Sequence, residues 1–335
     1  MICEHKNKIM SPHVFISPGD PAGIGPEITL KSLKNLNETR KFVIAGDIQY
    51  LENLSASLKL GFEFIPYGVS KTTSSSKLIE VINIPLQEKP VLGSSSVNNA
   101  KYILEVLSTC AEHCMDNTNN ILVTGPINKE TISASGTDFS GHTEFLAEHA
   151  KIVSPLMLMA NEKIKIGLAT THIPIKKVSE SITEDLIYNK LKVLCFGLKR
   201  LLKKENLKIC VLGLNPHAGE GGYIGTEEST TILKGIKKFD QREVTVDGPI
   251  SADTAFSEKN LSHYDAFLAM FHDQGMIPAK ILGFGQTLNI TFGLPYLRIS
   301  VDHGTALDIA DDMNADFSSM KLALETALAS LDEKK

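Results

Sequence analysis

Short apolar runs alternate along the chain with longer amphipathic segments, which indicates an α/β protein. The apolar runs predict strands at 13–17, 41–46, 62–66, 78–84, 120–124, 155–160, 163–169, 208–214, 244–246, 266–271, 287–292 and 297–301. The amphipathic segments predict helices that begin at Pro26 and near His142, and others at 47–60, 97–115, 184–204, 227–239 and 315–331. Asp47 is expected to cap the helix at 47–60. The neighbouring runs at 155–160 and 163–169 predict an antiparallel pair. We therefore expect two intertwined α/β lobes with a cleft between them and no internal repeat.

The stretch from Ala266 to Gly275 organises the rest of the chain. Its apolar part, Ala266 to Phe271, predicts a buried strand that ends abruptly in His272-Asp273-Gln274-Gly275. Ligands of α/β proteins bind outside the carboxyl ends of strands, so this polar cluster is well placed for chemistry. The alternative is an ordinary helix start at which Asp273 serves as the cap.

Three histidines occupy the same kind of position. His172, His217 and His272 each follow the end of an apolar run that predicts a strand. If those strands share one region of the sheet, the three imidazoles can converge on one cation. Three protein ligands and an open position form a catalytic divalent metal site. The alternative is that each histidine is a satisfied structural residue.

Cations and polar turns cluster after this stretch. Lys280, Asn289 and Arg298 recur nine residues apart, each near the end of a predicted element, and could hold a phosphate or a carboxylate. Each of them could equally be a surface residue that only faces water. The turn 301–306 precedes Leu307-Asp308 and can present backbone groups to a ligand. Asp253 and Asp273 are candidate proton acceptors.

Two glycine-containing turns precede helices earlier in the chain. The turn at 18–27 is neither a P-loop nor the G-x-G-x-x-G dinucleotide motif, so it is either a tight active-site turn or plain strand-to-helix punctuation. The turn at 125–129 ends in a cation, Lys129. Cys110 and Cys114 flank His113 at helical spacing, and this favours a helix face over a zinc site.

Composition narrows the class of partner. The 335 residues carry a net charge of −5 and are 42% hydrophobic and 22% charged, which is ordinary for a globular protein and argues against a nucleic-acid or membrane-surface protein. A few local cations must therefore hold any anionic substrate. The sequence has no run long enough for a transmembrane helix and no secretory leader, and its five scattered cysteines favour a reducing, cytoplasmic setting. Residues 1–11 are expected to be a loose N-terminal extension.

The motifs together resemble a known family, the 4-hydroxythreonine-4-phosphate dehydrogenases of vitamin B6 biosynthesis. The matching segments are GDPAGIGPE (19–27), TGPINK (124–129), SGHTEFLAE (140–148), TTHIP (170–174), LNPHAGEGG (214–222), DGPISADTAF (247–256), HDQG (272–275), and NITFGLP through RISVDHGTALDIA (289–310). The resemblance implies an isocitrate/isopropylmalate-dehydrogenase-like fold of two α/β lobes. It also implies a homodimer with active sites at the interface, and an NAD(P) site that needs no G-x-G-x-x-G motif.

The resemblance also implies roles for individual residues. The metal ligands are His172, His217 and His272, with one of them supplied across the dimer. The substrate-binding residues are His142, Thr143, Lys280, Asn289 and Arg298. The VDHGTA turn and the residues after it, including His303, Gly304, Thr305 and Asp308, match the region that holds the adenosine part of the cofactor. The base stays open among Asp253, Asp273 and Lys280.

The implied reaction is oxidation of the C3 hydroxyl of 4-phosphooxy-L-threonine by NAD(P)+, followed by loss of CO2 to give 3-amino-2-oxopropyl phosphate. A divalent metal (Zn2+, Mg2+ or Co2+) would polarise the hydroxyl. The chain departs from the family pattern at Asp311-Asp312, whose carboxylates would repel a 2′-phosphate and favour NAD over NADP.

Three alternatives remain on sequence grounds. A sister dehydrogenase that acts on 4-phospho-D-threonate or 4-phospho-D-erythronate would share the metal and phosphate residues. A metal-dependent aldolase or hydrolase could use the same histidines without a nucleotide. A non-catalytic binding protein of this fold is the third.

Overall fold

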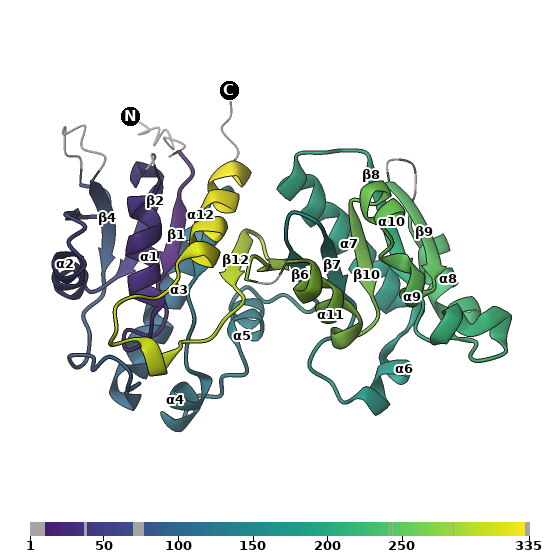
Figure 1. Cartoon of the computed structure of the whole chain (residues 1–335), viewed down its shortest axis with the longest axis horizontal. Coiled ribbons are helices and arrows are strands. Elements are labelled where there is room, and N and C mark those ends of the chain that lie inside the picture. Colours follow the sequence, from purple (N-terminus) through teal and green to yellow (C-terminus); the bar gives the residue numbers. More distant parts are fainter. Residues whose placement is uncertain are drawn as a thin grey trace, which may run out of the picture.

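A computed structural model describes residues 11–36, 39–69, 77–240, 242, 244–283 and 285–331. Most of the expected N-terminal extension therefore lies outside the described residues. Figure 1 shows two lobes side by side, both built on strands covered by helices. The predicted α/β class is confirmed.

One 12-stranded sheet runs through both lobes in the order β3-β4-β2-β1-β5-β12-β11-β6-β7-β10-β8-β9. The strands are β1 (Val14–Ser17), β2 (Phe42–Gly46), β3 (Glu63–Pro66), β4 (Leu78–Asn83), β5 (Ile121–Thr124), β6 (Leu156–Ala160), β7 (Lys165–Leu168), β8 (Leu207–Leu212), β9 (Val244–Ile250), β10 (Ala266–Ala269), β11 (Leu288–Phe292) and β12 (Leu297–Val301). Pairing is parallel at both ends of the sheet and antiparallel in the middle, where β12, β11, β6 and β7 follow one another. The predicted antiparallel pair, β6 with β7, is confirmed.

The chain leaves the first lobe once and later returns to it. The first lobe holds β1 to β5 and the second holds β6 to β11, while β12 pairs with β5 and so belongs to the first lobe again. The closing helix α12 then packs beside α1, as Figure 1 shows. The α-helices are α1 (Gly25–Lys34), α2 (Ile48–Ser57), α3 (Ala100–Asp116), α4 (Lys129–Ala134), α5 (His142–His149), α6 (Val178–Ser181), α7 (Glu184–Leu202), α8 (Leu233–Lys238), α9 (Ala252–Ala255), α10 (Glu258–His263), α11 (His272–Leu282) and α12 (Ser318–Ser330).

Several helix starts follow from local sequence. Asp47 precedes α2, and its side chain accepts a hydrogen bond from Tyr50 N at 2.9 Å, so the predicted cap is confirmed. Pro26 lies in the first turn of α1, where a missing N–H costs nothing. The helix expected at 227–239 instead begins as a π-helical turn, Glu228–Ile232, before α8.

The apolar cores define where a site can form. One core lies under α1, α12 and α7 and continues through both lobes on one face of the sheet. The other face has two separate cores, one around α3 and α5 in the first lobe and one around α11 in the second. The middle strands β11 and β12 lie between those two cores, and Met157 and Met159 of β6 form the border of the core around α11. Side chains of these three strands on this face are therefore available to a ligand. Within the described residues, no helix is both long enough and apolar enough to cross a membrane.

Candidate active site

The floor of the site is formed by side chains of the middle strands. Ser300 pairs with Asn289 and Asn289 with Met159, which makes one row across three strands. Arg298, Thr291 and Met157 make the next row, two residues along each strand. Because side chains two apart on a strand share a face, both rows point the same way. Five of these six side chains, all but Thr291, line a cavity of about 300 Å3.

Arg298 is a buried cation at the base of this cavity. Its side chain is only 2% exposed, and its guanidinium donates to Thr124 Oγ1 at 2.7 and 3.1 Å and to Thr291 Oγ1 at 3.2 Å. Burial lowers the pKa of Arg298 to about 10. No carboxylate among the described residues forms an ion pair with it, and two of its five N–H groups stay available. A buried charge of this kind calls for an anionic ligand.

His142 and Thr143, at the start of α5, line the wall beside Arg298. Burial, and then the charges of Arg298 and Lys129, hold the pKa of His142 well below its usual range, so its imidazole is neutral. The buried Nε2 of His142 and Oδ1 of Asn289 have no hydrogen-bond partner among the described residues. Unpartnered buried polar atoms are rare in folded proteins, so both atoms are available to a ligand.

His172 and His272 enter the same cavity from the second lobe. Their ring centroids are 5.7 Å apart. Two imidazoles bound to one zinc ion, with Zn–N bonds of about 2.0–2.1 Å, place their centroids roughly 5 Å apart, so the pair is close to a shared-metal arrangement. The structure therefore brings two of the three predicted metal ligands together.

His217 lies outside that cavity. It follows β8 on a turn in which residues 217–221 all have positive φ, between 46° and 77°. The buried carboxylate of Glu228 holds this turn, because it accepts hydrogen bonds from Leu214 N at 2.8 Å and Asn215 N at 2.7 Å. Among the described residues, no three His, Cys, Asp or Glu side chains gather closely enough to hold a metal.

Each of the three histidines has its Nδ1 directed at a carboxylate. The distances are 3.8 Å from His172 to Glu144, 3.6 Å from His217 to Asp253, and 2.7 Å from His272 to Asp273. Metal-binding histidines are commonly oriented by a carboxylate on the second ring nitrogen, which leaves Nε2 to bind the metal. Only the contact of His272 is a hydrogen bond, so Asp273 orients that ring directly, while Glu144 and Asp253 are at longer electrostatic distance from His172 and His217. Within the described residues, one chain does not bring the three histidines together.

The three candidate bases lie in different surroundings. Asp253 accepts a hydrogen bond from Ser251, and this lowers the pKa of its exposed carboxyl. Asp273 contacts His272 and caps nothing, because the residue at the N-cap of α11 is Phe271, whose side chain makes no capping bond. The alternative that Asp273 is a helix cap is therefore wrong.

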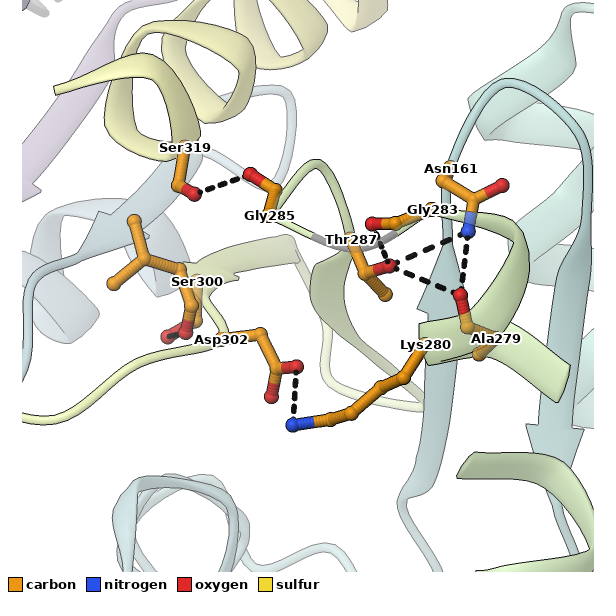
Figure 2. A network of polar contacts seen from close by, with 10 residues as sticks. Asn161, Ala279, Lys280, Gly283, Gly285, Thr287, Ser300, Asp302 and Ser319 are labelled. Carbon is orange, nitrogen blue, oxygen red and sulfur yellow. Dashed lines mark hydrogen bonds and ion pairs between the residues drawn. The ribbon is translucent and has the colours of Figure 1, made fainter. Parts of the chain in front are cut away.

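Lys280 is the third candidate and forms an ion pair that joins the lobes. Its Nζ, on α11, lies 3.2 Å from Oδ2 of Asp302, just after β12 (Figure 2). In Figure 2, Ser319 of α12 likewise donates to Gly285 O at 3.0 Å, a second link between the lobes. Lys280 and His272 both border a shallower, mostly apolar depression next to the cavity, with Met276, Ile277 and Ile281.

The predicted cofactor turn packs on the glycine-rich turn at 18–27. Ile24 N donates to Thr305 O at 3.0 Å, and a Cβ on Gly23 would lie 2.7 Å from that oxygen, so only glycine permits this approach. His303 and Gly304 line the cavity, and the buried Nε2 of His303 has no partner among the described residues. Thr305 and Asp308 lie outside the cavity lining. Residues 18–27 do not line the cavity either. This turn contacts the site only indirectly, through the backbone of Thr305.

Sequence reasoning missed several residues of the site. Met157 and Met159 of the floor look like ordinary core positions, and Thr124 and Thr291 look like ordinary strand residues. Only the strand pairing reveals that they surround Arg298. Glu144, which faces His172, could have been found from the sequence, because it belongs to the segment SGHTE and follows its glycine by three residues.

These features define an α/β enzyme that takes a small anionic substrate on the face of its sheet, where its two lobes meet. Comparison with known proteins gives the particular family. The family model described as "Pyridoxal phosphate biosynthetic protein PdxA" matches residues 38–327. The chain therefore belongs to this family, the 4-hydroxythreonine-4-phosphate dehydrogenases, which are oxidoreductases of pyridoxal phosphate biosynthesis and, as dehydrogenases, imply a nicotinamide cofactor.

Individual relatives match over almost their full length. The 4-hydroxythreonine-4-phosphate dehydrogenases of Pseudoalteromonas atlantica and Erwinia tasmaniensis are 37% and 39% identical to this chain, over 96% and 94% of this chain and 98% and 96% of theirs. The solved structure of a 4-hydroxythreonine-4-phosphate dehydrogenase from Klebsiella pneumoniae superimposes with a TM-score of 0.85 at 33% identity, over 96% of this chain and 100% of that one.

Proposed function

We propose that this chain oxidises the C3 hydroxyl of 4-phosphooxy-L-threonine with NAD+ and that the product then loses CO2 to give 3-amino-2-oxopropyl phosphate, in the cytoplasm. The observation that carries the proposal is the cavity itself, in which a buried Arg298 without a carboxylate lies beside unpartnered atoms of His142 and Asn289. This donor set suits a small phosphorylated acid, because its charge is compensated only when an anion is bound.

The chain's own groups would bind and orient the substrate. Thr143 and Asn289 offer neutral hydrogen-bonding groups beside the charged Arg298, and neutral His142 can either donate or accept at Nε2. Lys280 approaches from the second lobe. To bind the substrate, it must give up its ion pair with Asp302 and form one with the substrate instead. Substrate binding would thereby hold the two lobes together and exclude water from the reacting carbon.

A divalent metal fits the two cavity histidines and their carboxylate partners. His172 and His272 would hold it, with Glu144 and Asp273 fixing the two rings. When bound, the metal would lower the pKa of the substrate hydroxyl, and nicotinamide would accept the hydride. Histidine ligands suit Zn2+ or Co2+, and Mg2+ would need more oxygen ligands.

The third histidine would come from a second copy of the chain. Ile277 and Ile281 on α11 are 58% and 76% exposed beside the cavity, an apolar surface that a monomer would leave uncovered. The turn that carries His217 also presents Tyr223, which is 92% exposed. We infer a homodimer in which His217 of one copy reaches His172 and His272 of the other, with Asp253 orienting it.

Mixed dimers test this arrangement directly. His217→Ala and His272→Ala should each be inactive, and equal amounts mixed after dissociation should recover about a quarter of wild-type activity, because half of the dimers then hold one intact site. No recovery, while light scattering shows that mixed dimers form, would contradict the shared site. Ile281→Glu should give a monomer that neither binds Zn2+ tightly nor turns over substrate.

The proton acceptor stays open among the three candidates. Asp253 contacts His217 and Asp273 contacts His272, so Lys280 is the one of the three candidates that contacts no histidine. The two exposed carboxylates of Asp311 and Asp312 support NAD as the preferred cofactor, because they would repel the 2′-phosphate of NADP.

The substrate is tested by NAD+ reduction with metal-loaded enzyme. Turnover of 4-phosphooxy-L-threonine should exceed that of 4-phospho-D-threonate, which carries a hydroxyl in place of the amino group. The opposite preference would reassign the chain to the sister activity and leave the site residues in place. Absence of NAD+ reduction with both would contradict the proposed reaction.

A further inference from the structure

Lys129 is a cation of the cavity that has no assigned role. It ends the turn TGPINK and begins α4, where Asn128 caps the helix through Thr131 N at 3.1 Å. Its side chain lines the same cavity as Arg298 and His142. Among the described residues, its Nζ has neither a hydrogen-bond partner nor an ion-pair partner.

The chain makes room for this lysine. A Cβ on Gly141 would lie 3.3 Å from Lys129 Nζ, 3.6 Å from its Cε and 2.7 Å from Oε2 of Glu144. The lysine head therefore lies over the backbone of Gly141, one residue before His142. A larger residue at 141 would push the ammonium group away from the cavity wall.

Lys129 and Arg298 act on the same imidazole. Lys129, His142 and Arg298 line one cavity, and the charges of both cations disfavour protonation of His142. Lys280, in contrast, belongs to the other lobe, contacts Asp302 and borders the neighbouring depression. The cations of the site thus fall into two groups: Lys129 with Arg298 in the cavity of His142, and Lys280 at the neighbouring depression.

The substrate has two anionic groups of unequal charge. At neutral pH its phosphate carries close to two negative charges. Its carboxylate carries one, and the neighbouring ammonium group of the substrate offsets that charge. Lys129 and Arg298, which have no carboxylate partner within ion-pair distance in the described part of the chain, match the phosphate. Lys280, in a half-exposed ion pair, matches the carboxylate. Arg298 supplies a planar pair of N–H groups and Lys129 a mobile point charge, a combination that surrounds a phosphate from two directions.

We propose that Lys129 is a further substrate-binding residue, which holds the substrate phosphate together with Arg298 in the cavity that His142 also lines. This assignment rests on the proposed substrate and adds to it the location of the phosphate. It leaves Lys280, from the other lobe, for the carboxylate of the substrate.

The test is a titration with inorganic phosphate, followed by isothermal calorimetry, on the full-length metal-loaded protein. For Lys129→Gln we expect the Kd for phosphate to rise about 10- to 100-fold, the range for loss of one charge-assisted contact, while Lys129→Arg keeps most of the affinity. Lys163→Gln, on the exposed hairpin between β6 and β7, removes the same charge elsewhere and should leave the Kd unchanged. An unchanged Kd in Lys129→Gln would overturn the proposal.

A kinetic comparison separates the phosphate from the rest of the substrate. Lys129→Gln should lower kcat/KM for 4-phosphooxy-L-threonine by the same factor and change that for 4-hydroxy-L-threonine less than about threefold. Equal losses with both would show that Lys129 serves another part of the substrate, and would also refute the proposal. If the wild type reduces no NAD+ with either, the proposed reaction fails, and the phosphate titration still decides the role of Lys129.

Discussion

His142 should make the protein less stable in mildly acidic solution. Burial and two nearby cations lower the pKa of this histidine in the folded state, whereas in the unfolded chain it titrates near its ordinary value of about 6.5. Above that pH neither state binds a proton at this site. As the pH falls below about 6.5, the unfolded state binds a proton at His142 that the folded state does not bind, so the free energy of unfolding decreases.

The size of the effect follows from this linkage. The loss cannot exceed RT ln(1 + 10^(6.5 − pH)), which is about 1.4 kcal/mol at pH 5.5 and about 2 kcal/mol at pH 5.0. His142→Gln keeps a polar side chain at this position and cannot take up the proton. The variant's stability should therefore fall less than that of the wild type between pH 7.5 and 5.5, by up to about 1.4 kcal/mol.

Urea unfolding followed by circular dichroism, at pH 7.5, 6.5 and 5.5, measures this difference. Other histidines with lowered pKa values, such as His13, contribute equally to both proteins and cancel in the comparison. Parallel stability curves for the wild type and His142→Gln would show that the imidazole titrates normally, and would refute the electrostatic description of the site. Added phosphate should reduce the effect, because a bound anion offsets the two cations.

Further substitutions test other contacts of the site. Asp302→Asn frees Lys280 from a partly exposed ion pair, so the free energy of unfolding should change by less than about 1 kcal/mol. The KM for the phosphorylated substrate should fall up to about fivefold, because Lys280 is then available to the substrate. A higher KM would contradict this role. Glu228→Gln keeps one carbonyl acceptor for the two backbone N–H groups but removes the negative charge and the second oxygen, which accepts from Asn215 Nδ2. We expect about 2 kcal/mol lower stability and weaker zinc binding, measured by denaturation and metal titration. Replacing both Asp311 and Asp312 with Asn should raise kcat/KM with NADP relative to NAD about tenfold, and equal ratios would remove the case for NAD selectivity.

Much of the fold could be predicted from the sequence because its strands are short, strongly apolar and separated by clear helix starts. The cap at Asp47 and the antiparallel pair β6–β7 depend only on neighbouring residues, and both are confirmed. Element ends were harder to predict. The strand expected to reach Phe271 ends at Ala269, and β9 continues to Ile250, because pairing with neighbouring strands decides where a strand stops.

The site was less predictable, because its geometry depends on which strands are neighbours. Spacing of nine residues picked out Asn289 and Arg298, yet the reason they meet is that β11 and β12 pair antiparallel in the middle of the sheet. Convergence of three histidines was expected from three strand ends, and one chain brings only His172 and His272 together. Position along the sequence cannot reveal that His217 sits on a left-handed turn outside the cavity.

The place of β12 in the sheet has a consequence for synthesis of the protein. This strand joins the edge of the first lobe, β5, to the edge of the second, β11, and it is the last strand to be made. Until it leaves the ribosome, each lobe ends in an open strand edge, and open edges favour pairing with other chains. Arg298 arrives on that same strand. A chain that stops short of residue 297 would therefore consist of two half-sheets with open edges that are prone to aggregate, and it would lack Arg298. The buried cation of the cavity and protection from aggregation are thus acquired in a single late step.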